Sequence, residues 1–172
     1  MEVPVSFDSL EVLYITNDNE GTYDVPLNKY NEIMSRVKRL HFKSFAVDTK
    51  EYSYRDLTLI RKLDDQQDCV ETKVYQTAPI YIWDSKNVQW IFSNKKKLTP
   101  VAFPSTRNHD MITHKKRTSF RVNNRIYINF EQEKTDEQVF HKIYLNFNNG
   151  KDTDIKECID AITKLVQQIF HE

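Results

Sequence analysis

HKKRTSFRVNNRIYINFEQEK, residues 114–134, decides how this sequence folds. The stretch carries six basic and two acidic side chains, yet its other residues are largely the β-branched and aromatic types that are typical of strands. Two adjacent residues near its middle, Asn123 and Asn124, predict a turn, because asparagine tolerates a positive φ better than most residues. The stretch is therefore expected to form a β-hairpin, with strands at about 111–122 and 125–134.

The length of the hairpin loop decides which side chains share a face of the sheet. A loop of two residues would mix charged and apolar side chains on both faces, whereas an odd loop such as 122–124 separates them, since the side-chain period of a strand is two. We expect the odd loop. One face then carries a polar set: Lys115, Arg117, Ser119, Arg121, Arg125, Tyr127, Asn129, Glu131 and Glu133. The other face carries Phe120, Ile126, Ile128 and Phe130, together with Lys116 and Thr118.

The next predicted strand, 138–147, adds Lys142, Tyr144 and Asn146 to the polar face. Two interpretations remain open. The face is solvated and its charges compensate one another, as Glu131 and Glu133 allow, or it is concave and its basic groups hold phosphate oxygens, which the guanidinium fork suits. The candidate phosphate-binding or RNA-binding residues are Lys73, Lys115, Arg117, Arg121, Arg125 and Lys142.

The rest of the chain predicts an α+β fold. Apolar residues recur at helical spacing over about 26–40 and about 153–170, and Asp154 with Glu157 has the spacing of a capping box. The first helix is expected to bury Leu27, Tyr30, Ile33, Met34, Val37 and Leu40. Short strands are expected at about 10–16, 42–47, 52–62, 69–76, 79–84, 88–93, 111–122, 125–134 and 138–147, and an exposed loop at 93–110. Short links favour antiparallel pairing in a barrel-like sheet of about eight strands.

Composition narrows the classes of function. The chain has 172 residues, which suits a single domain spanning 1–172, and its 25 basic and 25 acidic residues balance. Only two glycines are present, so the glycine-rich phosphate loops are excluded. The two cysteines, Cys69 and Cys158, have neither zinc-ligand nor disulfide spacing, which favours a reducing compartment, cytoplasmic or nuclear. No secretory leader or membrane-spanning segment is expected.

The order of elements and the motif KKRTSF (115–120) resemble the triphosphate-tunnel family. The resemblance is in particular to the metal-dependent RNA triphosphatase domains of messenger-RNA capping enzymes in fungi, protists and large DNA viruses. LEVLYIT (10–16) resembles the first acidic strand, and ETKV (71–74) the strand with a phosphate-binding lysine, here Lys73. KKRTSFRV (115–122) resembles the basic strand, and FHKIYLNF (140–147) the last acidic strand. The resemblance implies an eight-stranded barrel around a polar tunnel that binds a triphosphate.

The sequence departs from the family where the family binds its divalent cation. Family enzymes place alternating glutamates on the first and last of these strands. Here the alternate position after Glu11 is Leu13, and the last strand carries no carboxylate. If the protein is catalytic, Glu11, Glu131 and Glu133 would have to hold Mg²⁺ or Mn²⁺; otherwise no cofactor is expected.

The expected function is therefore that of a tunnel-fold relative, viral or cellular, tied to RNA capping or transcription. It would bind an RNA 5′ triphosphate, another polyanion or a protein partner, and no membrane, as a pseudoenzyme with a degraded metal site. The alternative is a non-enzymatic structural or host-interaction protein with a solvated, charged sheet face.

Overall fold

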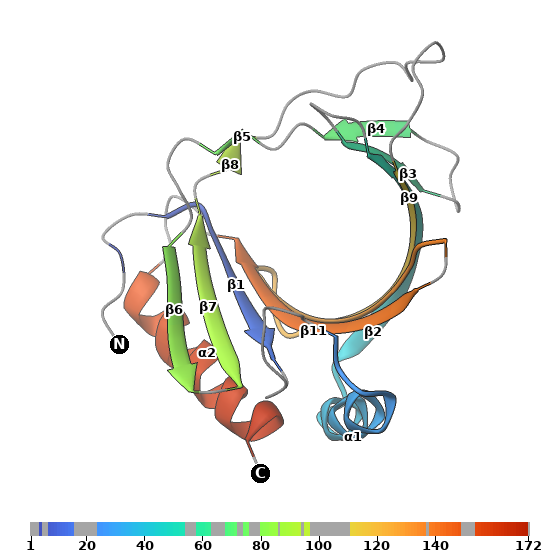
Figure 1. Ribbon diagram of the computed structural model, residues 1–172. Helices are drawn as coiled ribbons and strands as arrows, with labels where there is room; N and C mark the ends of the chain where they lie inside the picture. Colours follow the sequence, from blue (N-terminus) through green and yellow to red (C-terminus); the bar gives the residue numbers. More distant parts are fainter. Residues whose placement is uncertain are drawn as a thin grey trace.

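The chain forms a strongly curved antiparallel sheet with two helices on one side (Figure 1). The structure is a computed structural model that describes residues 4, 7–15, 24–53, 58–62, 68–71, 74–75, 80–85, 87–93, 95–96, 111–136, 138–148 and 154–171, with backbone alone at 53, 58–62, 68–71, 74–75 and 95–96. Its elements are β1 (Ser9–Tyr14), α1 (Leu27–Lys38), β2 (Lys43–Ser53), β3 (Thr58–Lys62), β4 (Asp68–Glu71), β5 (Val74–Tyr75), β6 (Ile80–Ser85), β7 (Val88–Ser93), β8 (Lys95–Lys96), β9 (Met111–Arg121), β10 (Ile126–Lys134), β11 (Val139–Asn148) and α2 (Ile155–Phe170).

Nine strands make the main sheet in the order β4-β3-β2-β9-β10-β11-β1-β7-β6, and β5 pairs with β8 in a second sheet. The predicted α+β class, antiparallel pairing and two helices are confirmed. The sheet is barrel-like in its curvature, as expected, but the described strands do not close into the eight-stranded barrel that the resemblance implies. Closure would need backbone hydrogen bonds between the edge strands β4 and β6, and these lie on opposite sides of the hollow in Figure 1.

Several strand boundaries also differ from the prediction. The expected strand 52–62 spans the end of β2 and all of β3, and the expected strand 69–76 spans most of β4 and all of β5. The chain was expected to break between 47 and 52, but β2 runs unbroken from Lys43 to Ser53, because β9 pairs with it along its whole length. The predicted exposed loop at 93–110 contains β8, which pairs with β5. Long-range pairing decides the last two cases, and local sequence does not report it.

The hairpin of β9 and β10 has the predicted odd loop. Arg121 is paired with Tyr127, so five residues rather than the expected three separate the paired positions, and the parity is unchanged. The side chain of Asn123 fixes this turn, because its Oδ1 accepts hydrogen bonds from the backbone N–H groups of Arg125 at 2.8 Å and Ile126 at 2.9 Å. The predicted division of side chains between two faces is therefore confirmed.

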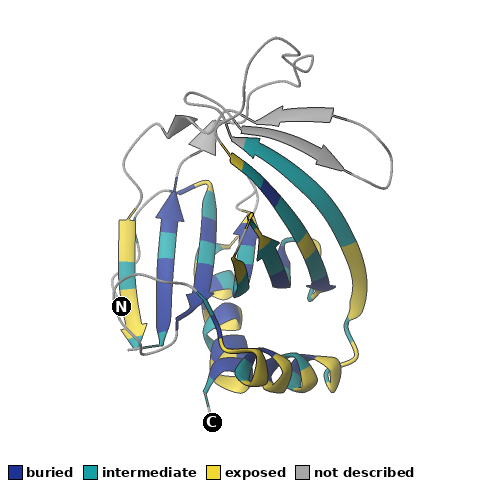
Figure 2. Ribbon diagram, turned by 45° about the vertical axis from the view of Figure 1, so that its right-hand side comes forward, coloured by how far each residue is buried: buried dark blue, intermediate teal, exposed yellow. Residues whose placement is uncertain are grey.

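The hydrophobic core lies between the sheet and the helices. In Figure 2 the strands that the helices back are largely buried, whereas the start of β2, where it leaves α1, is exposed. Phe130 of β10 packs edge-on against Tyr30 of α1, with ring centroids 5.5 Å apart, and against Phe120 at 5.7 Å. The helix α2 buries Ile159, Ile162, Leu165, Val166, Ile169 and Phe170, close to the predicted stripe. The prediction fails for Leu27, which is exposed because it occupies the first turn of α1.

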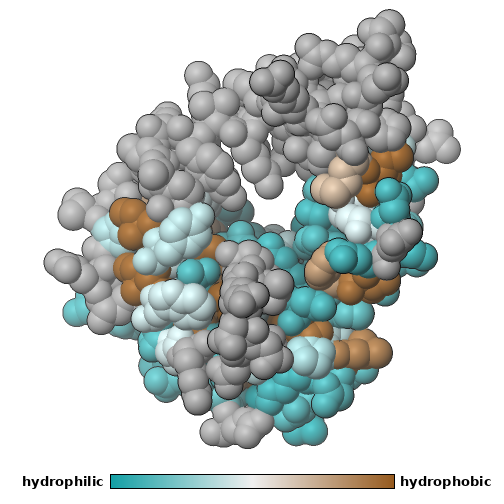
Figure 3. Space-filling model, viewed as in Figure 1, coloured by the Kyte–Doolittle hydropathy of each residue, from teal (hydrophilic) through white to brown (hydrophobic). Residues whose placement is uncertain are grey.

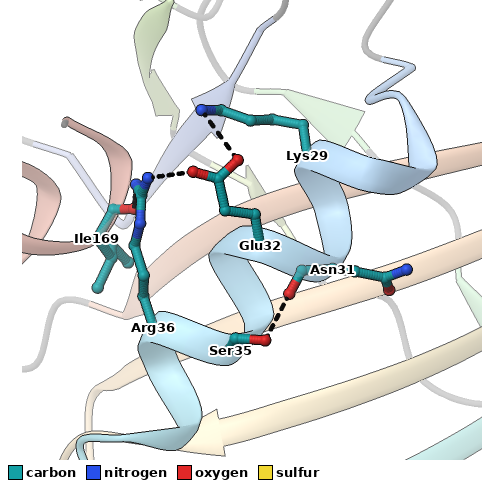
Figure 4. A network of polar contacts seen from close by, with 6 residues as sticks. All are labelled: Lys29, Asn31, Glu32, Ser35, Arg36 and Ile169. Atoms are coloured by element: carbon teal, nitrogen blue, oxygen red, sulfur yellow. Dashed lines mark hydrogen bonds and ion pairs between the residues drawn. The ribbon is translucent and has the colours of Figure 1, made fainter.

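Polar contacts join the two helices (Figure 4). Nη1 of Arg36 in α1 donates to the backbone carbonyl of Ile169 at 3.0 Å, in the last turn of α2, where the helix dipole favours a cation. Glu32 contacts the same guanidinium at 2.6 Å and Lys29 at 3.5 Å. At the other end of α2, Asp154 accepts from the N–H of Glu157, as the predicted cap requires. Neither helix among the described residues is long and apolar enough to span a membrane.

Candidate anion-binding face

The polar set of the hairpin lies on the inner, concave side of the sheet. Phe130 points to α1, so its neighbours Asn129 and Glu131 point away from the helices, since successive side chains alternate across a strand. The sheet curves away from α1 and α2 (Figure 1), and the space-filling view shows a hollow whose floor is largely hydrophilic (Figure 3). The strand registers place one set of residues on this concave face: Glu11, Phe45, Val47, Thr49, Glu51, Lys115, Arg117, Ser119, Arg121, Tyr127, Asn129, Glu131, Glu133, Lys142, Tyr144 and Asn146.

Lys115 is the centre of one ion-pair cluster on the concave face. Its Nζ lies 3.0 Å from Oε2 of Glu51 on β2 and 3.6 Å from Oε1 of Glu133 on β10. Burial opposes the charge on Lys115, but the nearby carboxylates of Glu131, Glu51 and Glu133 outweigh it and raise the pKa of this lysine above its ordinary value. Lys115 is therefore compensated within the protein.

Lys142 forms a second pair. Its Nζ lies 3.1 Å from Oε1 of Glu11 on the neighbouring strand β1, and 4.6 Å from the ring centroid of Tyr144, in cation–π geometry. Burial raises the pKa of the Tyr144 hydroxyl, so this phenol stays neutral. The cation thus sits between a carboxylate and an aromatic ring.

Glu131 lies between these two clusters and is buried, with 5% of its surface exposed. Burial is the main cause that raises its pKa from 4.5 to about 7; the charges of Lys115 and Lys142 act in the opposite direction, while the hydrogen bond to Glu133 and the charge of Glu133 raise it further. A carboxyl group that is half protonated near neutral pH is a poor ligand for a hard cation.

Arg117 faces Glu131 across the β9–β10 pair, with Val47 on its other side. Its side chain is hydrogen-bonded to Tyr144. In the described part of the chain its Nε is buried and has no hydrogen-bond partner, as is also the case for Oε1 of Gln89 on the same face. A buried donor left without a partner costs about 1–3 kcal/mol, so this N–H is available to donate to an acceptor on the concave face.

Next to Arg117, a chain of neutral polar groups crosses three strands. The hydroxyl of Ser119 donates to Oδ1 of Asn129 at 2.7 Å, and Nδ2 of Asn129 donates to Oδ1 of Asn146 at 2.5 Å. These bonds satisfy buried groups on the concave face and fix their orientation.

The structure brings most of the predicted site residues together, but not all. Lys115, Arg117, Lys142, Glu11, Glu131 and Glu133 share the centre of the concave face, and Arg121 lies toward its hairpin end, in contact with Asn124. Arg125 was expected on the same face and lies instead in the longer loop. Burial raises the pKa of Cys158 on α2, and the charge of Arg125 partly opposes this rise. Lys73 lies outside the described residues.

Glu51 belongs to the site and was not predicted. It pairs with Lys115, but the sequence placed it in a break between two strands, so no face could be assigned to it. The only signal for it is the alternation of Val47, Thr49 and Glu51 along an uninterrupted β2.

The residues on the concave face do not fit the divalent cation that the metal-dependent RNA triphosphatases bind. Among the described residues, no three His, Cys, Asp or Glu side chains come together so that they could hold a metal ion. Instead the ammonium of Lys142 occupies the space beside Glu11, and Glu131 is held partly protonated. A metal ion would have to displace the lysine.

A cavity of about 460 Å³ lies on the other, helix-facing side of the sheet, beside α1. Its lining is mixed and comprises Tyr30, Ala46, Val47, Asp48, Lys116, Arg117, Thr118 and Gln132. Near it, Nε2 of His114 lies 2.5 Å from Oδ1 of Asp48. Lys116 and Thr118 of β9 line it, and Val47 and Arg117, which belong to the concave face, contribute to the lining as well.

The fold matches those of known RNA triphosphatases. No protein-family model matches the sequence, and no curated protein matches it either. Among solved structures, the S. pombe Pct1 RNA triphosphatase superimposes with a TM-score of 0.76 at 12% identity, covering 98% of this chain and 86% of Pct1. Pct1 in complex with the Spt5 CTD gives 0.71 at 12% identity, covering 98% and 88%. The Mimivirus capping enzyme triphosphatase gives 0.60 at 11% identity, covering 96% and 90%.

A plant protein extends the comparison. HpAC1 from Hippeastrum, described as a putative adenylyl cyclase with a dominant triphosphatase activity, gives a TM-score of 0.53 at 7% identity, covering 95% of this chain and 87% of HpAC1. At identities this low, the superpositions establish the fold alone, and the function has to be argued from the side chains of the site. The chain therefore has the fold of the triphosphate-tunnel proteins, as the order of its elements and the motif at 115–120 predict.

Proposed function

We propose that the concave face binds a polyphosphate, the 5′ triphosphate of RNA in particular, and that it does so without a divalent cation. The observation that carries this proposal is Arg117, whose buried Nε has no partner among the described residues and lies on the concave face. Lys115 and Lys142 flank it at the centre of that face. Arginine beside lysine is a common arrangement for binding phosphate oxygens.

The charge balance supports binding rather than hydrolysis. Lys142 pairs with Glu11, and Lys115 with Glu51 and Glu133, so both lysines are held in place. The acidic groups that would hold a metal are neutralised by lysines or, in Glu131, by burial. Transition-state stabilisation by a metal is therefore not supported by these side chains. The likeness to RNA triphosphatases supports a role connected with RNA capping or transcription.

The first experiment measures phosphate release and binding together. Phosphate release from 5′-triphosphorylated RNA is followed with Mg²⁺ or Mn²⁺, and the melting temperature is followed with inorganic tripolyphosphate. We expect a raised melting temperature and no turnover. Turnover abolished by Glu11→Ala would instead assign Glu11, Glu131 and Glu133 to a metal site. No response in either assay would favour the alternative, a structural or host-interaction protein whose inner charges compensate one another.

A protein partner is a second candidate, supported by the edge strand β6. Ile80, Tyr81 and Trp83 are large apolar residues with about half of their surfaces exposed, at 48%, 55% and 55%. An exposed edge strand with such side chains can pair with an extended peptide. Pct1, which shares the fold, has been solved with the Spt5 CTD. Loss of partner capture in a Tyr81→Lys, Trp83→Lys variant would test this candidate.

A further inference from the structure

An aromatic pair lies on the concave face beyond the ion-pair clusters. Phe45 of β2 and Tyr127 of β10 have ring centroids 6.2 Å apart with an interplanar angle of 80°. Phe45 keeps 45% of its surface exposed although it is one of the largest apolar residue types. The hydrophobic core lies on the other side of the sheet, so this pair is not part of it.

Basic residues surround the pair. Arg121 is the paired neighbour of Tyr127 on one side and of Lys43 on the other, so both cations share the face with the aromatic rings. Arg121 and Lys43 are both exposed, and Arg121 contacts the side chain of Asn124. We call Lys43, Phe45, Arg121 and Tyr127 the aromatic platform. Exposed rings beside Arg and Lys form the kind of surface on which single-stranded nucleic acids stack their bases.

The aromatic platform lies in line with Arg117. Arg117 is opposite Glu131 on β10, and Tyr127 is four residues along the same strand, about 13 Å away at about 3.3 Å per residue. A ligand that places phosphates at Arg117 and continues along the face toward the hairpin loop reaches Phe45 and Tyr127 after its ribose.

We propose that the first base of a 5′-triphosphorylated RNA stacks on one ring of the Phe45–Tyr127 pair while the other ring, nearly perpendicular to it, contacts the edge of the base. Lys43 and Arg121 hold the phosphate that follows this base. This inference rests on the proposed binding of the triphosphate at Arg117. Stacking needs only the flat face of a base, so the platform accepts any of the four bases.

The test compares two ligands that differ in having a nucleoside. Affinities for inorganic tripolyphosphate and for a short 5′-triphosphorylated RNA are measured with the whole chain and with two variants, Phe45→Ala and Tyr127→Leu, the second of which keeps an apolar side chain of similar bulk. We expect both variants to bind the RNA at least tenfold more weakly and to keep the wild-type affinity for tripolyphosphate. Tyr81→Ala, which removes an exposed aromatic ring on β6, is the matched control and should change neither affinity.

A fluorescent base analogue gives a direct readout. When 2-aminopurine is the first base, binding should quench its fluorescence in the wild type and in Tyr81→Ala, and not in Phe45→Ala. Equal losses for both ligands in the platform variants, or unchanged RNA affinity in both, would overturn the inference while the proposed function stands. A wild type that binds neither ligand would overturn both.

Discussion

Nζ of Lys142 lies 3.1 Å from Oε1 of Glu11, across the pair of strands β11 and β1. The ammonium also faces the ring of Tyr144 and contributes to the charge environment of Glu131. A protein cation therefore pairs with one carboxylate of the concave face and lowers the pKa of a second, Glu131, against the effect of burial. The lysine is tethered to the chain, so it is retained under conditions that remove metal ions.

The first prediction concerns metal ions. Mn²⁺ or Mg²⁺ alone should leave the melting temperature of the wild type unchanged, and a chelator should not weaken tripolyphosphate binding, because Lys142 already neutralises Glu11. Lys142→Glu, which places a third carboxylate near Glu11 and Glu131, should acquire stabilisation by Mn²⁺, whereas Lys142→Met should not. Thermal melting with and without the ions measures this, and stabilisation of the wild type by Mn²⁺ would contradict it.

The second prediction separates the two faces of β9. Arg117→Ala should weaken tripolyphosphate binding by about tenfold to a hundredfold, since a charge-assisted hydrogen bond contributes roughly 1.5–3 kcal/mol. Lys116→Ala removes the same charge from the adjacent position, which points to the helix-facing side, and should leave binding unchanged. Calorimetric titration of both variants decides the matter. Similar losses in the two would mean that the anion responds to net charge and not to the concave face.

The third prediction follows from the pKa of Glu131. Its native pKa of about 7 lies above its ordinary value of 4.5, so between these values the native state binds more protons than the unfolded state. The free energy of unfolding should therefore fall as the pH rises from about 4.5 to about 7. Above this range Glu131 is ionised in both states, and its contribution to stability should change no further.

Glu131→Gln removes the titration. The variant should be more stable than the wild type at about pH 8, by an amount on the order of 2 kcal/mol, and the difference should shrink toward about pH 5. Urea unfolding at the two pH values measures both quantities. Asp136→Asn, at an exposed carboxylate beyond the end of β10, serves as the control. A variant less stable than the wild type at the higher pH would show that ion pairing, not burial, dominates at Glu131.

The fourth prediction compares the contributions of the helix-facing side and the concave side of the sheet to the stability of the fold. Phe130→Ala should cost about 3–5 kcal/mol of stability, because it removes the ring that packs against Tyr30 and Phe120. Phe45→Ala, on the opposite face, should cost much less, since that ring is half exposed. Chemical denaturation of the two variants compares them directly, and similar costs would mean that the concave face also carries core packing.

The faces of β9, β10 and β11 were predictable because two signals agree there. The alternation of side chains has a period of two, and one of the two sets, with Phe120, Ile128 and Phe130, is apolar enough to pack on helices. The helices themselves follow from their apolar stripes, and the cap at Asp154 from its spacing to Glu157.

Other features depend on contacts between distant segments, which local patterns do not encode. Glu51 joins the site because β2 pairs with β9 over its full length, and its own neighbourhood predicts a break. Arg125 leaves the site because the loop is two residues longer than expected. The direction in which the sheet curves depends on where α1 and α2 pack, so the sequence alone left both a solvated face and a concave one possible.

Because both helices pack on one side of the sheet, the residues of the hydrophobic core and the residues proposed to bind the anion lie on opposite faces of the same strands. Substitutions at Arg117 or Lys142 should leave the core rings in place, because these side chains lie on the concave face, whereas substitutions at Phe130 should destabilise the fold, because its ring belongs to the core. The two faces of one strand can therefore diverge at different rates. The same scaffold can carry different charges inside the hollow, as a TM-score of 0.76 to Pct1 at 12% identity illustrates.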